Sequence, residues 1–134
     1  LFLNPCEESY CRLGSDKAPL YVTWSAENRS QLIRIPAAVG EYRRAELRSA
    51  DPTANPYIAY ALLIYAGMYG LEHDLQLCPA SDFNVYAAPA EVLSGLKKLP
   101  GSLYEAAALA GASAFISKHL PETVISAYRH RCEA

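Results

Sequence analysis

Arginine is concentrated in one stretch of this sequence. Five of the eight arginines lie between residues 27 and 56, although the formal net charge of the whole chain is only -2. They are Arg29, Arg34, Arg43, Arg44 and Arg48. A solvated charged surface usually mixes Lys with Glu, whereas the planar guanidinium group makes forked contacts with carboxylate and phosphate oxygens. The stretch therefore predicts a local site for anionic groups.

One carboxylate stands among these cations. Residues 44–49 have the pattern of a short strand, in which alternate side chains share a face, so Arg44, Glu46 and Arg48 are expected on one side. The trio has two interpretations. It is an ion-pair ladder that only stabilises a sheet, or Glu46 is a ligand for a hard metal ion beside arginines that neutralise phosphate.

A second candidate element is a loop that follows Arg12. It reads Gly14-Ser15-Asp16-Lys17-Ala18-Pro19 and consists of small or polar residues between a glycine and a proline. Such loops close over ligands as lids in some proteins and only connect elements in others. Asp16 and Lys17 are the residues of a candidate lid.

Composition limits the function classes. A chain of 134 residues with 51% hydrophobic residues is long enough for one compact domain with a sizeable core. The pI of about 5.9 and the charged fraction of 19% argue against nucleic-acid and anionic-membrane partners. The longest apolar run, residues 58–69, is too short to cross a bilayer. We expect a cytoplasmic location.

The cysteines and histidines show no metal-site spacing. Cys6, Cys11, Cys78 and Cys132 are expected to be free thiols. The three histidines stand apart from one another and are left out of any site. The chain begins at Leu1 without a methionine, inside an apolar run, and is expected to be a piece of a longer protein.

The elements that position the arginines follow from local patterns. Strand-forming residues at 20–25 and 31–35 flank a turn at 26–30, which predicts a hairpin with Arg29 at or near its tip. Asn55 and Pro56 then have the residue types of a helix N-cap and first helical position. The helix predicted for residues 56–76 is apolar on most sides and is expected to be buried and central.

The rest of the chain is mostly helical. The fold class we predict is α+β, with a small antiparallel sheet packed by three to four helices. Ser102 and Glu105 have capping-box spacing before an alanine-rich helix. The other expected segments are a helical turn at 7–11, a short helix at 90–96, a connection at 114–119 and a final helix from 121.

Several short motifs occur in order along nearly the whole chain. They are Ser9-Tyr10-Cys11-Arg12-Leu13, Asn28-Arg29-Ser30, Ile33-Arg34-Ile35-Pro36, Arg44-Ala45-Glu46-Leu47-Arg48, Asp51-Pro52, Ala54-Asn55-Pro56-Tyr57, Asn84-Val85-Tyr86, Leu99-Pro100 and Ser102-Leu103. Each motif is short, but the ordered set is specific. It resembles the end of the catalytic domain of the glutamine synthetase family. The resemblance implies that residues 1–134 are the C-terminal portion of such a domain, as a single compact unit.

The resemblance also implies a reaction and its site. ATP phosphorylates the γ-carboxylate of glutamate, and ammonia displaces the phosphate, with Mg²⁺ or Mn²⁺ as the metal. Glu46 would be a metal ligand. The arginines would bind the other groups: Arg12 and Arg48 the glutamate carboxylates or the acyl phosphate, Arg29 the transferring phosphoryl group, and Arg34 and Arg44 the nucleotide phosphates. Arg29 and Arg48 would thus be the catalytic residues.

The loop departs from the family pattern. In the family it usually ends Gly-x-Glu-Ala-Pro, and the glutamate is associated with closing the site and taking a proton from ammonium. Here the loop is one residue shorter and Lys17 falls at the position of that acid. Two alternatives to glutamine formation follow. One is a γ-glutamyl ligase that uses another amine, and the other is a non-catalytic relative that acts in assembly or regulation.

The resemblance places much of the active site outside this chain. In the family, the other metal carboxylates, a histidine ligand and most of the nucleotide pocket lie upstream of the equivalent of Leu1. An N-terminal β-grasp domain completes each site from a neighbouring subunit. We therefore expect a homo-oligomer for the full-length protein and no activity for the 134-residue fragment alone.

Overall fold

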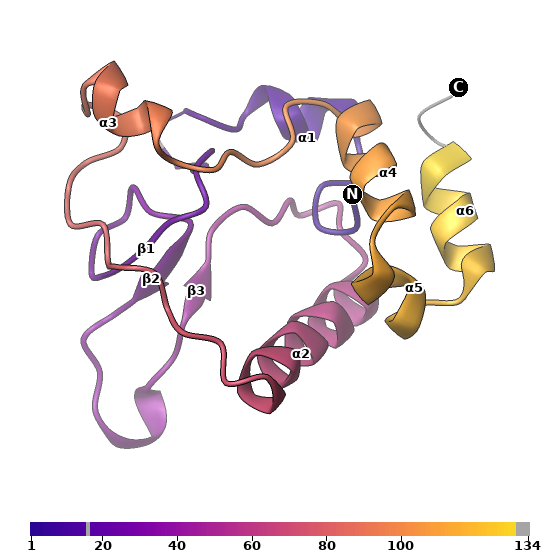
Figure 1. Cartoon of the computed structure of the whole chain (residues 1–134), viewed down its shortest axis with the longest axis horizontal. Coiled ribbons are helices and arrows are strands. Elements are labelled where there is room, and N and C mark those ends of the chain that lie inside the picture. Colours follow the sequence, from indigo (N-terminus) through magenta and orange to yellow (C-terminus); the bar gives the residue numbers. More distant parts are fainter. Residues whose placement is uncertain (16, 131–134) are drawn as a thin grey trace. The chain divides into compact units, whose positions relative to one another are not determined.

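The computed structural model describes residues 1–15 and 17–130 (Figure 1). The chain divides into two compact units. Unit 1 comprises residues 1–10, residues 51–77 and the chain from residue 100 onward, and unit 2 comprises residues 11–50 and 78–99. The single compact unit expected over residues 1–134 stays a prediction.

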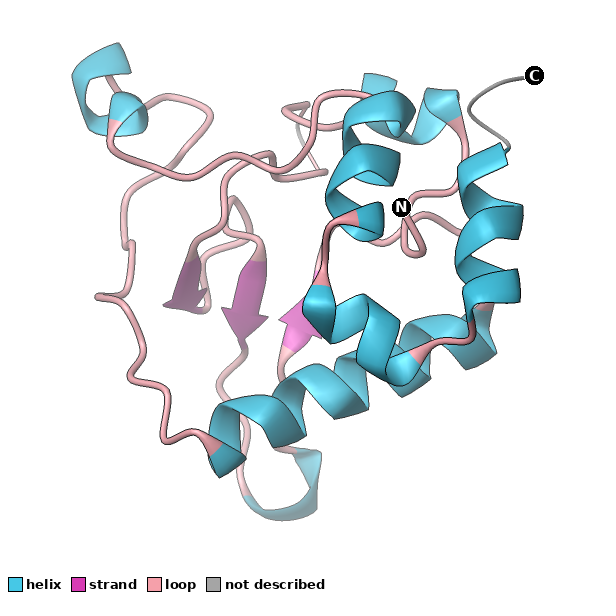
Figure 2. Ribbon diagram, turned by 45° about the vertical axis from the view of Figure 1, so that its right-hand side comes forward, coloured by secondary structure: helices cyan, strands magenta, loops and turns pink. Residues whose placement is uncertain are grey.

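Unit 2 contains a small three-stranded sheet in the order β1-β2-β3 (Figure 2). The strands are β1 (Trp24–Ala26), β2 (Ile33–Ile35) and β3 (Glu46–Leu47). Strand β1 pairs with β2 in parallel, whereas β2 pairs with β3 in antiparallel orientation. The predicted hairpin between the first two strands is therefore wrong, and only one of the two pairings has the antiparallel direction that we predicted.

The parallel pairing follows from the length of the connection. Residues 27–32 span up to roughly 20 Å when extended, about twice the length of the three-residue strand β1. The chain can therefore return along β1 before β2 begins. Two hydrogen bonds fix this path, from Ile33 N to Thr23 O at 3.0 Å and from Glu27 N to Ile35 O at 3.1 Å. Strand-forming residues predict the strands, but they do not fix the direction of their pairing.

The second segment of unit 2 runs beside the first. Residues 20–22 bond to residues 97–99 through Val22 N to Lys97 O and Leu99 N to Leu20 O, both at 2.8 Å. Trp24 Nε1 donates to Cys78 O at 2.7 Å. Unit 2 also contains the 3-10 turn η1 (Gly40–Tyr42) and the short helix α3 (Ala90–Ser94). These contacts bring residues 78–99 against residues 20–24, which precede the arginine-rich stretch.

Unit 1 is built mainly from helices. The helices outside the sheet region are α1 (Glu7–Cys11), α2 (Pro56–Glu72), α4 (Leu103–Gly111), α5 (Ala114–His119) and α6 (Glu122–His130). Helix α4 packs against α6 and α5. The buried core cluster consists of Phe2, Leu62, Ala110, Ile125 and Tyr128. With α3, the described residues form six helices, more than the three to four predicted, because residues 7–11 and 114–119 are helical as well.

The predicted helix starts are confirmed. Asn55 Oδ1 accepts hydrogen bonds from Tyr57 N at 3.0 Å and Ile58 N at 3.3 Å, so Asn55 caps α2. Ser102 Oγ accepts from Glu105 N at 3.1 Å, and the Glu105 carboxylate accepts from Gly101 N at 2.8 Å. These pairings satisfy backbone donors that a helix cannot satisfy itself.

The burial predicted for the long helix is wrong. Helix α2 ends at Glu72 rather than at residue 76, and only Leu62 on it is buried. Tyr57 is 85% exposed and Ile64 is 65% exposed. An all-round apolar helix needs neighbours on every side. The core of unit 1 contacts α2 through Ile58 and Leu62 and leaves its other faces open.

For membrane spans and disulfides, the structure gives findings on the described residues only. None of their helices has the length and apolar character that a membrane span requires. Among the described residues Cys6 and Cys78 are free thiols, and Cys132 lies outside the described residues. The α+β class with a small sheet is confirmed, and within this sheet Arg34 lies in β2 and Glu46 in β3.

Candidate functional site

Glu46 lies between two guanidinium groups. Strand β2 pairs with β3 so that Arg34 stands opposite Glu46. Arg34 Nη1 donates to Glu46 Oε2 at 2.9 Å, and Arg44 Nη2 donates to Glu46 Oε1 at 3.2 Å. Hydrogen bonds between such charged groups are stronger than those between neutral groups. The structure therefore brings three predicted site residues together in an ion-pair ladder.

Arg34 is the more restrained of the two arginines. Its side chain is 17% exposed, against 54% for Arg44. Arg34 Nε also donates to Glu27 O at 2.9 Å. Glu27 adopts a left-handed backbone conformation with φ of 66°, and its Oε1 accepts from Ala37 N at 3.2 Å. Arg44 is therefore the cation of this pair that solvent and ligands reach more easily.

The same contacts stabilise the charge on Glu46. The hydrogen bond from Arg34 is the main cause that lowers the pKa of Glu46 below its usual value. Burial opposes the shift, whereas attraction to Arg34 and the contacts of Arg44 add to it. The Glu46 side chain is 31% exposed, so solvent weakens these effects. Glu46 is an ionised carboxylate at neutral pH, the state that a hard-metal ligand needs.

The lowered pKa of Glu46 predicts a pH-dependent contribution to stability. Because the folded pKa lies below the unfolded one, the contribution is complete above the ordinary value of 4.5 and disappears as the pH falls through the folded pKa. We expect Glu46→Gln to lower the free energy of unfolding at neutral pH, and we expect this effect to shrink as the pH falls below 4.5 and through the folded pKa. Urea unfolding across this range measures the difference.

The control for this prediction is Glu41→Gln. Glu41 is exposed in η1, so the substitution reports the general effect of losing one surface carboxylate. A destabilisation by Glu46→Gln that stays constant from neutral to acidic pH would contradict the assignment of the ion pairs as the source of the lowered pKa.

Arg29 is presented by a compact turn. Asn28 Oδ1 accepts from both Ser30 N and Ser30 Oγ at 2.9 Å, which closes a local turn around Arg29. Ser30 is buried, whereas the Arg29 side chain is exposed. Within residues 1–15 and 17–130, Arg29 has no hydrogen bond or ion pair through its side chain. Its guanidinium is therefore available to an external anion.

The Arg12 side chain contacts the backbone next to Arg48. Arg12 Nη2 donates to the carbonyl oxygen of Ser49, a buried residue next to Arg48 in sequence. Arg48 N donates to Leu32 O at 2.9 Å, which holds it beside β2. Among the described residues, Arg48 Nη1 is buried and has no hydrogen-bond partner. A buried charged donor without an acceptor is costly, so this atom fits an anionic oxygen supplied by a ligand.

The candidate lid loop is anchored at both ends. Gly14 has φ of +90°, which favours glycine, and Gly14 N donates to Ala18 O at 2.7 Å. Ala18 and Pro19 are buried, whereas Lys17 is exposed. Asp16 lies outside the described residues. The interpretations as lid and as connector both remain open.

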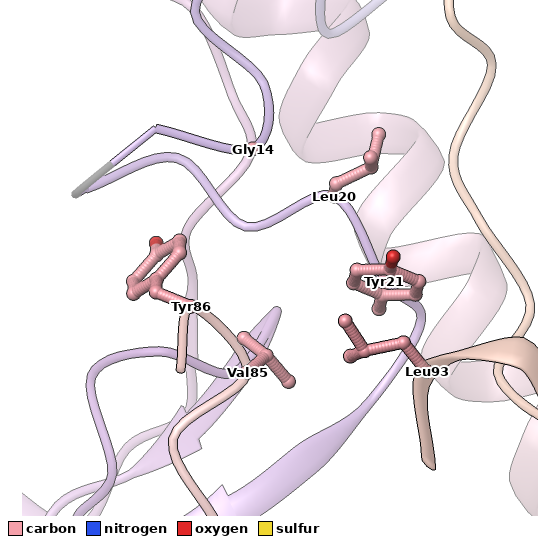
Figure 3. A pocket seen from close by; sticks show the side chains of 6 residues that line it. All are labelled: Gly14, Leu20, Tyr21, Val85, Tyr86 and Leu93. Carbon is pink, nitrogen blue, oxygen red and sulfur yellow. The ribbon is translucent and has the colours of Figure 1, made fainter. Parts of the chain in front are cut away.

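A cavity of about 200 Å³ lies within unit 2 beside this loop (Figure 3). It is lined by Gly14, Leu20, Tyr21, Val85, Tyr86 and Leu93. The lining offers two tyrosine hydroxyls and otherwise apolar groups, and none of these six side chains carries a formal charge at neutral pH. This cavity is therefore not the predicted anion site.

The described residues by themselves do not form a complete metal site. Glu46 fits one oxygen ligand of Mg²⁺ or Mn²⁺, but both of its oxygens already accept from arginine. Across the part of the chain that the structure describes, no group of three or more His, Cys, Asp or Glu side chains could hold a metal ion. Further ligands would have to come from outside the described residues.

One feature of this site, the contact of Gln31, has no signal in the sequence. Gln31 is fully buried next to the Arg29 turn, and its Nε2 donates to Phe83 O at 2.7 Å. The two residues are 52 positions apart. A glutamine between strand-forming residues carries no signal for such a distant partner, so local patterns could not have found it.

Comparisons with known proteins define the class of this chain. A family profile described as "Glutamine synthetase, catalytic domain" matches residues 1–133. The chain is 40% identical over 128 residues to glutamine synthetase of Methanosarcina mazei, and the match covers 93% of this chain and 29% of that protein. It is 44% identical over 106 residues to glutamine synthetase of Pyrococcus furiosus, covering 77% of this chain and 24% of that protein.

A solved structure has a similar fold. The structure described as "GmaS/ADP complex-Conformation 1" superposes with a TM-score of 0.79 at 25% sequence identity and covers 98% of this chain and 31% of that one. The fold and the sequence thus define a piece of a ligase catalytic domain. The chain belongs to the glutamine synthetase family. It spans less than a third of the length of the relatives that it matches.

Proposed function

We propose that this chain is the C-terminal portion of the catalytic domain of an ATP-dependent glutamate–ammonia ligase. The match of the glutamine synthetase catalytic-domain profile to residues 1–133 carries the proposal. The arrangement in unit 2 supports it, since it offers the exposed Arg29 and the unpartnered Nη1 of Arg48 to anionic groups.

The reaction has two steps. A γ-carboxylate oxygen of glutamate attacks the γ-phosphorus of ATP, and ADP leaves, which gives an acyl phosphate. Ammonium gives one proton to a base, and the nitrogen of the resulting ammonia attacks the γ-carbon. Inorganic phosphate then leaves, and the nitrogen loses a second proton to give the amide. In both steps negative charge increases on oxygen atoms in the transition state. Catalysis therefore depends on cations that are already in position.

In this proposal, different arginines bind different anionic groups. Arg29 binds the phosphoryl group during transfer, because its side chain is exposed and has no internal partner among the described residues. Arg12 and Arg48, joined through Ser49, bind the carboxylates of glutamate or the acyl phosphate. Arg34 and Arg44 bind nucleotide phosphates, with Arg44 the more accessible of the two.

Glu46 supplies one ligand for Mg²⁺ or Mn²⁺ in the full-length protein. Its ionised carboxylate and the adjacent arginines fit a site at which a metal and cations share phosphate oxygens. A bound divalent metal would stabilise charge that develops on those oxygens. The remaining ligands belong to other parts of the full-length protein, as do most of the nucleotide contacts.

A second candidate function is ligation of glutamate to a different amine. Lys17 occupies the loop position at which the family pattern has an acid. A lysine there does not attract ammonium as a carboxylate does. The structural neighbour described as a GmaS/ADP complex supports nucleotide use by this fold. In the third alternative, a non-catalytic role in assembly or regulation, the arginines are purely structural.

The proposed context is a homo-oligomer in the cytoplasm. The substrates are glutamate, ATP and ammonia or another amine, and no nucleic acid or membrane takes part. The acidic balance of the chain, with a pI of about 5.9, supports the proposal that nucleic acid and membranes are not partners.

Product assays test the proposed function. We expect the full-length protein to form γ-glutamyl amide and inorganic phosphate from glutamate, ATP and ammonia, and expect the 134-residue chain alone to form no γ-glutamyl hydroxamate. In this proposal Glu46 is the one carboxylate that the described residues contribute to the metal site, and the rest of the metal and nucleotide contacts come from other parts of the full-length protein. Parallel reactions with methylamine and ethylamine distinguish the two ligase functions.

Each outcome of these assays has a clear meaning. Faster turnover with an alkylamine than with ammonia identifies the second ligase function. No amide with any amine, from a correctly assembled full-length protein, supports the non-catalytic relative. A measurable rate from the purified 134-residue chain refutes the prediction that the fragment is inactive.

A further inference from the structure

The turn that carries Arg29 is tied to a single distant carbonyl group. Two side-chain amides donate to Phe83 O: Gln31 Nε2 at 2.7 Å and Asn28 Nδ2 at 3.0 Å. Ser30 Oγ, whose hydrogen is directed to Asn28 Oδ1, lies 3.5 Å from the same oxygen. All of these residues lie within unit 2. Residues 28–31 are therefore held against the chain at residue 83 from both sides of Arg29.

A further bond runs in the opposite direction. Val85 N donates to Ser30 Oγ at 3.1 Å. Val85 is buried and lines the cavity of Figure 3. We name the set Asn28, Ser30, Gln31, Phe83 and Val85 the 28–85 clamp. It fixes the backbone before and after Arg29, while the Arg29 side chain itself stays exposed.

Gln31 makes the shorter of the two amide hydrogen bonds to Phe83 O in the clamp. The residue has 0% exposure. Its Nε2 also donates to Ser30 Oγ at 3.3 Å, so both amide hydrogens have acceptors. Its Oε1 is buried and has no partner among the described residues. The Phe83 carbonyl fixes which end of the amide is the nitrogen, because an oxygen at that place would oppose another oxygen.

The amide nitrogen of Gln31 is hydrogen-bonded, whereas its amide oxygen has no partner among the described residues. This difference distinguishes Gln31 from a residue that only fills space. A buried amide oxygen without a donor is unfavourable, and an apolar side chain of similar size would avoid that cost. The donor end of the amide is therefore the part of Gln31 that the structure uses. That end acts on the turn that presents Arg29.

We propose that Gln31 is a positioning residue that holds Arg29 in place for the transferring phosphoryl group. The inference rests on the proposed ligase function, in which Arg29 meets that group. A cation that is already fixed needs no reorganisation when charge develops. Small displacements of such a group are expensive, and about 1 Å is enough to lower a rate up to roughly 10²-fold.

The test uses Gln31→Met in the full-length protein. Methionine has a similar length and volume but donates no hydrogen bond. We expect kcat to fall about tenfold with KM for glutamate and ATP changed less than about twofold, because the lost interaction acts in the transition state. The matched control is Thr23→Val, which alters a buried hydroxyl of the same unit outside the clamp. Thr23→Val should leave kcat within about twofold of the wild type.

A double-mutant cycle with Arg29→Ala separates positioning from general stability. If Gln31 acts through Arg29, Gln31→Met should change kcat less than about twofold once Arg29 is alanine. A purely structural role would lower kcat by the same factor in both backgrounds. The melting temperatures of Gln31→Met and Thr23→Val are measured alongside.

The outcomes separate this inference from the function on which it rests. An inactive full-length wild type, or an Arg29→Ala variant with wild-type kcat, overturns both. An active wild type with a weakened Arg29→Ala variant supports the role of Arg29. In that case, an unchanged kcat for Gln31→Met, or effects that multiply in the double variant, overturns the positioning role alone.

Discussion

Replacing Arg29 by alanine in the full-length protein is expected to lower kcat about 10²- to 10³-fold, the usual range for losing one preorganised group that stabilises transition-state charge. The KM values for glutamate and ATP should change little, because the interaction forms as the phosphoryl group moves. Arg29 is exposed and has no internal partner among the described residues, so its removal should leave the free energy of unfolding nearly unchanged. Steady-state kinetics and urea unfolding of the same preparations measure both effects.

Arg43 provides the matched control for this prediction. It is an exposed arginine in the same segment, and the proposed site gives it no role. Arg43→Ala removes the same formal charge and should keep kcat within about threefold. Equal losses of kcat in the two variants would mean that the general positive charge of the segment matters, and that Arg29 has no special place in phosphoryl transfer.

Replacing Arg48 by alanine should have the second large effect. We expect kcat/KM for glutamate to fall on the order of 10²- to 10³-fold, because the buried Nη1 of Arg48 has no acceptor among the described residues and is offered to a substrate oxygen. Arg48→Lys should not restore the activity, since an ammonium group lacks the planar fork of guanidinium.

A further variant, Arg48→Met, distinguishes substrate binding by Arg48 from a purely structural role. Arg48→Met keeps much of the apolar stem and removes the unpaired donor. If Arg48 binds substrate, Arg48→Met loses activity without loss of stability. If the arginines are structural, the variant unfolds at lower urea concentration or assembles differently while the remaining folded protein keeps its activity.

The contacts of Glu46 show how far a local pattern can predict a site. Alternation along residues 44–49 predicted that Arg44 and Glu46 share a face, and the two side chains do form a hydrogen bond. The stronger partner, Arg34, comes from the neighbouring strand β2. Alternation within one strand cannot predict which residue lies opposite on the next one, because that depends on the register between strands.

The path between β1 and β2 was not predictable for a related reason. Short strand-forming runs on either side of a polar turn favour a hairpin, yet the six residues 27–32 carry the chain back to a parallel pairing. The contacts that hold this connection lie at residues 83–85, far away in the sequence. Gln31 was overlooked for the same reason, since only its distant partner gives it a role.

Helix α2 shows the limit of composition as a guide to burial. Its cap at Asn55 and its start at Pro56 follow from local hydrogen bonding and were predicted correctly. Its burial depends on which elements pack around it, and within unit 1 these cover only one side. Apolar residues indicate that a surface favours contact, but they do not supply the partner.

The family assignment came from ordered motifs rather than from the fold. The motif of Asn28 to Ser30 and that of Arg44 to Arg48 both lie in unit 2, where the structure places the arginine contacts. In the proposed function, the phosphate, glutamate and metal contacts that distinguish the roles of these arginines involve the rest of the full-length protein.

Transfer of oxygen from glutamate to phosphate is the most direct test of the central claim that these arginines serve ligation through an acyl phosphate. Glutamate labelled with ¹⁸O in its γ-carboxylate is incubated with the full-length protein, ATP and ammonia, and the inorganic phosphate is analysed by mass spectrometry. If the γ-carboxylate oxygen attacks ATP, each phosphate released with amide formation carries one labelled oxygen. Amide formation with unlabelled phosphate, or ATP hydrolysis without amide, would contradict the account.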